Sequence, residues 1–217
     1  MLRYDAVLFD MDGTLLDTLE DITAALNLAL QENGYPTHTK AQVATYIGSG
    51  SLQLIERALP RHTAAGEVLR IRALYQQAYD RNQDFSTRPF PGVLPMLTAL
   101  DEAGLALGII SNKGAANVQK LAKEHFGSLF HAVFGAQDQT PIKPAPDMLL
   151  AAMRQLQAEP ERTLYIGDAP VDFEAAQNAG LDCILVRWGY GDPKALSLLS
   201  PRFYADDPAE LPMLIFG

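Results

Sequence analysis

Cysteine is nearly absent from this chain, since Cys183 is the only one, and an intrachain disulfide is therefore excluded. The run Cys183-Ile184-Leu185-Val186 favours a buried core thiol over a reactive one. The sequence also lacks an apolar stretch near the roughly 20 residues that a membrane-spanning helix needs. The N-terminal residues lead straight into an expected strand, which leaves no place for a signal peptide. We therefore expect a cytoplasmic protein without a membrane partner.

Positive charge is scarce as well, with 17 Lys and Arg residues against 26 Asp and Glu residues and a net charge of -9. This balance disfavours nucleic acid as a partner and makes any anionic ligand depend on local cations. A phosphate loop of the Gly-x-x-x-x-Gly-Lys-Ser/Thr type is absent, which argues against a P-loop nucleotide hydrolase. No metal-ligand pattern relates the four histidines, His38, His62, His125 and His131.

Two aspartates follow the first apolar run of the sequence. The run Ala6-Val7-Leu8-Phe9 predicts a strand buried on both faces, with Asp10 and Asp12 at its carboxyl end and on one side of the extended chain. Two carboxylates so close repel unless a cation intervenes, and oxygen ligands suit Mg²⁺. Gly13 lets the backbone approach this site without a Cβ. The alternative, an Asp-Gly hairpin turn, needs a second strand. Residues 15–33 instead carry apolar residues at helical spacing, with Thr18 and Asp21 as the start signal and Gly34 as the stop.

Further polar groups follow other expected strands. The apolar residues 105–110 predict a strand that brings Ser111 and Asn112 to the start of a helix over 115–126. A hydroxyl and free backbone amides there suit an anion, although a plain helix cap explains the same residues.

A second pair of carboxylates, Asp168 and Asp172, follows an expected strand at 164–167, with Asp172 one turn into a helix that runs to Asn178. Lys143 lies between prolines that stiffen its backbone, although a lone lysine is ordinarily solvated. Because open α/β sheets bind ligands at the carboxyl edge of their strands, we expect these groups to converge.

The chain resembles the haloacid dehalogenase-like hydrolases over nearly its whole length, and within them the phosphoglycolate phosphatase-like members. The matching segments are Asp10-x-Asp12-Gly13-Thr14 with Leu15-Leu16-Asp17-Thr18 behind it, Ser111-Asn112-Lys113, Lys143-Pro144 with Pro146-Asp147, and Gly167-Asp168-x-x-x-Asp172. The sequence departs from the pattern at Ala169, where many relatives have serine, and at Pro170 beside it.

The resemblance implies an α/β fold, a Rossmann-like parallel sheet core with an inserted helical cap. Residues 1–14 and 89–217 would form the core, and residues 15–88 the cap. The sequence agrees, because about 70 residues with helical periodicity precede the proline-rich, hinge-like stretch at 88–92, and helices alternate with strands after it.

The resemblance also implies catalytic roles. Asp10 would attack phosphorus and carry an aspartyl phosphate, and Asp12, protonated when the substrate arrives, would act as acid and then as base. Lys143 would complete the catalytic group and bind phosphoryl oxygens together with Ser111. The substrate-binding candidates are Thr14, Ser111, Asn112, Ser49 and Gly50.

Mg²⁺ is the implied cofactor. Its ligands would be Asp10, the backbone carbonyl of Asp12, and Asp168, while Asp172 would order the metal's waters or the neighbouring lysine.

Within the expected cap, the loop at 48–51 offers amides and hydroxyls to the substrate, or is simply a flexible turn. Arg57 is a candidate for binding a substrate carboxylate, or a surface arginine. The aromatic-glycine loop at 188–191 either borders the site or forms a packing corner.

We therefore predict a Mg²⁺-dependent phosphatase, monomeric or homodimeric, that acts on a small phosphorylated metabolite, with 2-phosphoglycolate as the leading substrate. A β-phosphoglucomutase-like mutase or a pyrophosphatase of the same family would keep Asp10 and Asp12. A phosphonate hydrolase needs a lysine in the cap loop, and Lys40 precedes that loop. A non-catalytic binding module on this fold is the alternative from another class.

Overall fold

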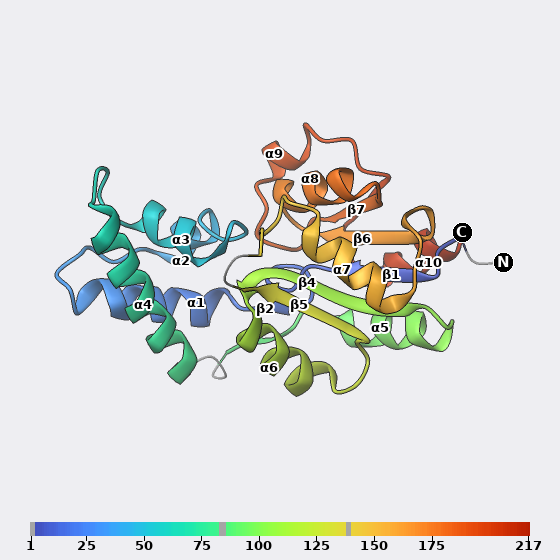
Figure 1. Ribbon diagram of the computed structural model, residues 1–217, viewed down its shortest axis with the longest axis horizontal. Helices are drawn as coiled ribbons and strands as arrows, with labels where there is room; N and C mark the ends of the chain where they lie inside the picture. The colour runs from blue at the N-terminus through green and yellow to red at the C-terminus, as the bar shows by residue number, and fades with distance from the viewer. Residues whose placement is uncertain (1–2, 83–85, 138–139) are drawn as a thin grey trace.

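The computed structural model describes residues 3–82, 86–137 and 140–217 (Figure 1). A parallel six-stranded sheet with the order β5-β4-β1-β6-β7-β8 forms its centre. The strands are β1 (Ala6–Phe9), β4 (Ala106–Gly114), β5 (Ala132–Ala136), β6 (Thr163–Gly167), β7 (Asp182–Val186) and β8 (Phe203–Ala205). Because β1 lies between β4 and β6, the residues that follow it have neighbours on both sides. The predicted α/β fold with a parallel sheet is confirmed.

Helices cover both faces of this sheet (Figure 1). On one face, α5 (Val93–Glu102), α6 (Ala115–Phe126) and α10 (Leu211–Phe216) pack against side chains that include Val7 and Phe9. On the other face, α7 (Asp147–Leu156), α8 (Pro170–Ala179) and the short α9 (Pro193–Leu196) pack against Leu8. Successive side chains of a strand point to opposite faces, so burial on both explains the continuous apolar run of β1. Two 3₁₀ turns, η1 (Pro160–Arg162) and η2 (Pro208–Glu210), complete the core.

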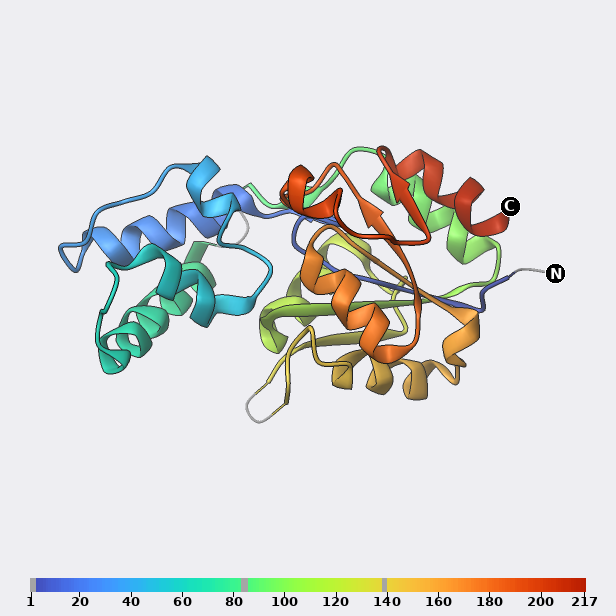
Figure 2. The same ribbon diagram turned by 90° about the horizontal axis from the view of Figure 1, so that it is seen from above.

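Four helices form a separate body at the carboxyl ends of the strands (Figure 2). They are α1 (Leu19–Gln31), α2 (Lys40–Ala44), α3 (Gly50–Ala58) and α4 (Ala65–Asn82). Leu26, Ile55 and Ile71 are fully buried in a hydrophobic cluster of their own. We call this body the cap. Residues 83–85 of the predicted cap interval lie outside the described residues, and the boundaries at 15 and 88 stay a prediction.

The chain crosses between core and cap twice, and the two crossings pair. Strand β2 (Leu16–Asp17) runs antiparallel to β3 (Arg88–Pro89). The buried Asp21 carboxylate ties them further, because its Oδ2 accepts hydrogen bonds from Thr87 N at 2.8 Å and Thr87 Oγ1 at 2.6 Å. The apolar spacing expected from residue 15 therefore includes a strand at residues 16–17, and the helix itself follows the predicted start signal Thr18. The helix begins at Leu19 because the residues before it pair with a strand far along the chain.

Cys183 is buried in β7, as its sequence context predicts. Burial raises the pKa of its thiol above the ordinary value, which suits an inert core residue. Within the described part of the chain, no helix is both long and apolar enough to cross a membrane.

Candidate active site

Three buried aspartates meet at the carboxyl edge of the sheet. Asp10 directly follows β1 and its amide donates to Ile166 O of β6 at 2.8 Å, so the nucleophile candidate is fixed between neighbouring strands. Asp168 follows β6, and Asp172 lies in the first turn of α8. Each of the three offers a carboxylate oxygen, and these oxygens all lie within 4.8 Å of one another. The convergence expected from strand ends is present in the structure.

Burial and the neighbouring carboxylates oppose the ionisation of Asp10 and Asp168. Burial raises the pKa of Asp10 to about 7, although Lys143 opposes the rise and Asp172 adds to it. Burial and the charges of Asp172 and Asp10 raise the pKa of Asp168 well above its ordinary value. Three carboxylates with one lysine leave an excess of negative charge that a divalent cation offsets, and carboxylate oxygens are the ligands that Mg²⁺ prefers. The donor set therefore fits Mg²⁺.

Close backbone approach shapes the cluster around Asp168. Gly13 has φ +90°, and a Cβ there would clash with Asp168 Oδ2, as would a Cβ on Gly189. Asp168 also accepts a hydrogen bond from Thr14 Oγ1 at 3.3 Å and one from Tyr190 N at 2.7 Å. The loop at 188–191 therefore borders the site, the first of the two interpretations that its sequence allowed.

Lys143 lies beneath these carboxylates and is almost fully buried. Its Nζ lies 2.8 Å from Asp10 Oδ1 and donates to Asp172 Oδ1 at 2.7 Å and to Tyr165 Oη at 2.9 Å. Burial favours a neutral amine, but the charges of Asp10 and Asp172 outweigh it and raise the pKa of Lys143 above its ordinary value. Lys143 is therefore a buried cation that orients Asp10, and Asp172 orients the lysine in turn.

The motif that begins at Ser111 belongs to a strand rather than to a helix start. Strand β4 continues to Gly114, past its predicted end at 110, and α6 follows directly. Ser111 is buried and lines the same cavity as Asp10. The Asn112 side chain donates to Gly48 O of the cap and to Lys143 O, both at 3.0 Å, and accepts from Lys143 N at 2.8 Å. Asn112 thus joins the cap loop to the segment that carries Lys143.

Asp12 is not part of the cluster formed by the other three aspartates and instead pairs with Lys113. Lys113 Nζ lies 3.0 Å from Asp12 Oδ1 and 3.2 Å from Oδ2, and 4.3 Å from the centroid of the Tyr79 ring on α4. Burial opposes the charge of Lys113, but Asp12 outweighs it and raises the pKa of the lysine. Sequence reasoning assigned Lys113 no role of its own, although it follows Ser111 and Asn112 in the matching motif.

A small cavity of about 50 Å³ lies between cap and core. Its core side includes Asp10, Asp12, Ser111 and Lys113. Its cap side is mostly apolar and aromatic and includes Ile22, Ile47, Leu54, Tyr75 and Tyr79.

The cap candidates divide between two places. Gly50, the first residue of α3, lines this cavity, whereas Ser49 lines a wider groove beside it that also contains Arg57 and Asp168. Arg57 is exposed and donates to Tyr46 O at 3.2 Å, which matches the interpretation of it as a surface arginine.

Comparison with known proteins identifies the family. The family model for haloacid dehalogenase-like hydrolases matches residues 7–186. A phosphoglycolate phosphatase of Pseudomonas syringae pv. tomato is 31% identical over 93% of this chain and 76% of its own length. One of Vibrio vulnificus is 32% identical over 94% and 93% of the two chains.

Solved structures agree. A crystal structure from Lactobacillus delbrueckii subsp. bulgaricus, assigned as a phosphoglycolate phosphatase, is 30% identical, covers 100% of both chains and superposes with a TM-score of 0.95. CbbY of Rhodobacter sphaeroides, solved in complex with phosphate, is 25% identical, covers 97% of this chain and 96% of its own, and has a TM-score of 0.80. The chain belongs to the haloacid dehalogenase-like hydrolases and is phosphoglycolate phosphatase-like within them.

Proposed function

We propose that this protein is a Mg²⁺-dependent phosphatase that hydrolyses a small phosphorylated metabolite through an aspartyl phosphate on Asp10, with 2-phosphoglycolate as the leading substrate. One observation carries the proposal. The Asp10 carboxylate borders a small cavity and lies beside Asp168 and Asp172, with the buried Lys143 ammonium 2.8 Å away. A module that only binds has no need of this costly buried cluster.

Two proton-coupled displacements complete the reaction. The Asp10 carboxylate attacks phosphorus, the bond from phosphorus to the ester oxygen breaks, and Asp12 donates a proton to the departing oxygen. Asp12 then removes a proton from water as that water attacks the aspartyl phosphate, which releases inorganic phosphate and restores Asp10. Both aspartates line the cavity where these atoms must meet.

Several groups are candidates for binding the phosphoryl oxygens. Ser111 would supply its hydroxyl, and Lys143, whose N–H groups face protein oxygens until substrate arrives, would supply its positive charge beside Asp10. Asn112 lines the cavity and Thr14 contacts Asp168, and both remain candidates for the same oxygens. From the cap, Gly50 closes the cavity, and Ser49 precedes it in the adjoining groove. Preorganised donors of this kind stabilise charge in the transition state without reorganising during the reaction.

The metal site proposed here comprises the carboxylates of Asp10 and Asp168 with the backbone carbonyl of Asp12, and Asp172 supports it through Lys143. Bound Mg²⁺ supplies positive charge that offsets the charge of the phosphoryl group.

The relatives support the choice of substrate. Two of the related proteins described above are phosphoglycolate phosphatases, and the related CbbY was solved with phosphate.

The test is phosphate release with Mg²⁺ from 2-phosphoglycolate, hexose phosphates, nucleoside monophosphates and pyrophosphate. We expect a preference for 2-phosphoglycolate and loss of turnover in Asp10→Asn, whose circular dichroism spectrum should match that of the wild type. Asp101→Asn alters an exposed carboxylate on α5 and serves as the matched control with full activity. No release from any substrate, or full activity in Asp10→Asn, would refute the proposal.

A further inference from the structure

Lys113 is the only cationic side chain among the described residues that line the cavity between cap and core. Lys143 is not part of this lining. It lies beneath Asp10, and its ammonium is surrounded by protein oxygens. An anionic group on the organic part of a substrate in this cavity therefore has Lys113 as its available cationic partner.

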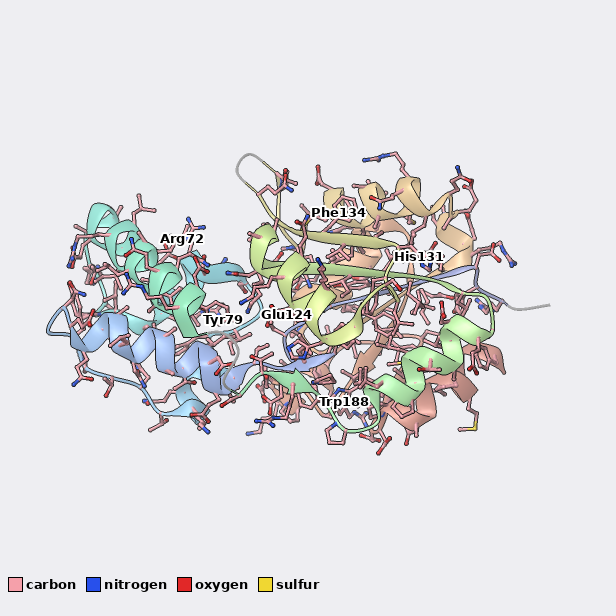
Figure 3. The ribbon with its side chains drawn as sticks, turned by 90° about the horizontal axis from the view of Figure 1, so that it is seen from below. Arg72, Tyr79, Glu124, His131, Phe134 and Trp188 are labelled. Atoms are coloured by element: carbon pink, nitrogen blue, oxygen red, sulfur yellow. The ribbon has the colours of Figure 1, made fainter. Side chains whose placement is uncertain are left out.

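Groups from both bodies of the molecule fix the position of Lys113. Asp12 of the core pairs with its ammonium at 3.0 Å, and the Tyr79 ring of the cap lies 4.3 Å away, a cation–π distance. Figure 3 places Tyr79 at the end of α4 that faces the core. The side chain of Lys113 is 8% exposed, so its charge acts in a largely dehydrated setting where ionic contacts are strong.

The position of Lys113 relative to Asp12 tells which part of a substrate it meets. In the proposed reaction Asp12 contacts the ester oxygen of the leaving group. Lys113 Nζ lies one contact beyond Asp12, where a substituent on the carbon that bears the ester oxygen would lie. A carboxylate at that carbon meets an ammonium there, whereas an uncharged substituent gains no ion pair.

Tyr79 adds a second polar group at the same place. Its hydroxyl is buried, interacts with the Lys113 ammonium and donates to no acceptor among the described residues, although the side chain lines the cavity. A buried O–H that donates to no acceptor is costly, and a carboxylate held by Lys113 offers it one. Arg57, the other candidate for a carboxylate, donates to backbone oxygens of the cap and lines the adjoining groove.

We propose that Lys113 is the specificity-determining residue that binds the substrate's carboxylate, so that the site selects phosphate monoesters of 2-hydroxy acids. This inference rests on the proposed function, because it takes the ester oxygen to lie beside Asp12.

Two substrates that differ in one group test it. In 2-hydroxyethyl phosphate a CH₂OH group replaces the carboxylate of 2-phosphoglycolate. The measurement is the ratio of kcat/KM for the two substrates in the wild type, Lys113→Met, Lys113→Arg and the control Lys123→Met, which alters an exposed lysine on α6. Any effect of Lys113 on Asp12 acts on both substrates and cancels in the ratio.

We expect the wild type to prefer 2-phosphoglycolate and Lys113→Met to lower the ratio by about 10- to 100-fold, the range for a lost hydrogen bond to a charged group. Lys113→Arg should restore part of the ratio, and Lys123→Met should leave it unchanged. Equal losses for both substrates in Lys113→Met, or no wild-type preference, would overturn the inference while the phosphatase assignment stands.

A binding measurement keeps the inference testable if turnover fails. No hydrolysis of either ester by the wild type would count against the proposed function. Calorimetric titration of Asp10→Asn protein with Mg²⁺ and each ester then decides about Lys113. Weaker binding of 2-phosphoglycolate alone after Lys113→Met supports the inference, and unchanged binding of both esters overturns it.

Discussion

Lys143 holds a buried ammonium group against more oxygen atoms than it has N–H groups to donate. Oxygens of Asp10, Asp172, Tyr165 and Ile110 lie between 2.7 and 3.1 Å from its Nζ. A lysine offers three donors, so every direction of the ammonium is used. Full use of its donors fixes the lysine, and the lysine in turn fixes the Asp10 carboxylate that it faces.

Among the groups that contact the Lys143 ammonium, the Tyr165 hydroxyl is the one whose removal changes the shape of the site least. Tyr165→Phe should lower the free energy of unfolding by about 1.5–3 kcal/mol, because a buried hydrogen bond to a charged group is lost. We also expect kcat to fall several-fold with little change in KM, since Lys143 then orients Asp10 less firmly. Denaturant unfolding and steady-state rates measure both effects.

Tyr4→Phe is the matched control for this prediction. Its hydroxyl donates to Asp182 Oδ2 at 2.7 Å, at the start of β7 and away from the carboxyl edge of the sheet. This variant should lose stability without losing kcat. Wild-type kcat in Tyr165→Phe would contradict the positioning role.

Among single residues, the sequence predicts the position of those that directly follow a strand. Asp10 and Asp168 each come directly after an apolar run, and the structure brings them together. Tyr165 lies inside such a run, where its pattern indicates only core packing, and the direction of its hydroxyl depends on Lys143 in a distant segment. The pairing of Lys113 could not be predicted for the same reason, since its partner Asp12 is 101 residues away.

Among the elements, helix α1 is capped by the core rather than by its own N-cap residue. Thr18, expected to begin the helix, makes no capping hydrogen bond with its side chain. The amides of Thr18 and Leu19 instead donate to Tyr190 Oη at 2.7 and 3.0 Å, and this hydroxyl donates to Asp17 Oδ1 at 2.7 Å. Because Tyr190 N also donates to Asp168, one residue connects the candidate metal site to the first cap helix.

Tyr190→Phe should therefore loosen the start of α1 while it keeps the backbone contact to Asp168. Loss of a helix cap costs about 0.5–2 kcal/mol, and amide hydrogens of the first turn should exchange faster with solvent. Hydrogen exchange followed by mass spectrometry measures this. The Tyr204 hydroxyl donates to Leu196 O near β8. Tyr204→Phe should therefore leave amide hydrogen exchange in α1 unchanged. Equal protection of α1 in Tyr190→Phe and wild type would rule out the capping role.

Elements set by local pattern could be predicted from the sequence, and elements set by distant pairing could not. The helix at 115–126 and the strand at 6–9 have their predicted bounds. Strand β4 runs past its predicted end because Gly114 pairs with Ala136 of β5 after an irregularity in register. Strands β2 and β3 are two residues each and exist because they pair across the intervening cap, which leaves no periodicity to detect.

For the whole molecule, the acidic cluster couples folding to pH and to metal. Asp10 has a pKa of about 7 in the folded protein, raised by burial from 3.8. Between these values the folded state binds a proton more tightly than the unfolded state, so stability without metal falls as pH rises. Mg²⁺ binds the ionised carboxylates, so its stabilising effect should grow over the same range.

We predict that Mg²⁺, compared with EDTA, raises Tm more at about pH 8 than at about pH 5.5, because the carboxylates must lose their protons to bind it. Thermal unfolding followed by circular dichroism measures the shift. Asp168→Asn should lose most of it, and Asp101→Asn, a change at the exposed surface, should keep it. A shift of equal size at both pH values would argue against these carboxylates as the ligands.

The covalent role of Asp10 is the central claim, and chemical trapping tests it most directly. Wild-type protein turning over 2-phosphoglycolate with Mg²⁺ is quenched and reduced with borohydride, which converts an aspartyl phosphate to homoserine, and its peptides are analysed by mass spectrometry. We predict homoserine at position 10 in the wild type and none without substrate or in Asp10→Asn. Rapid phosphate release with Asp10 never modified would contradict the mechanism.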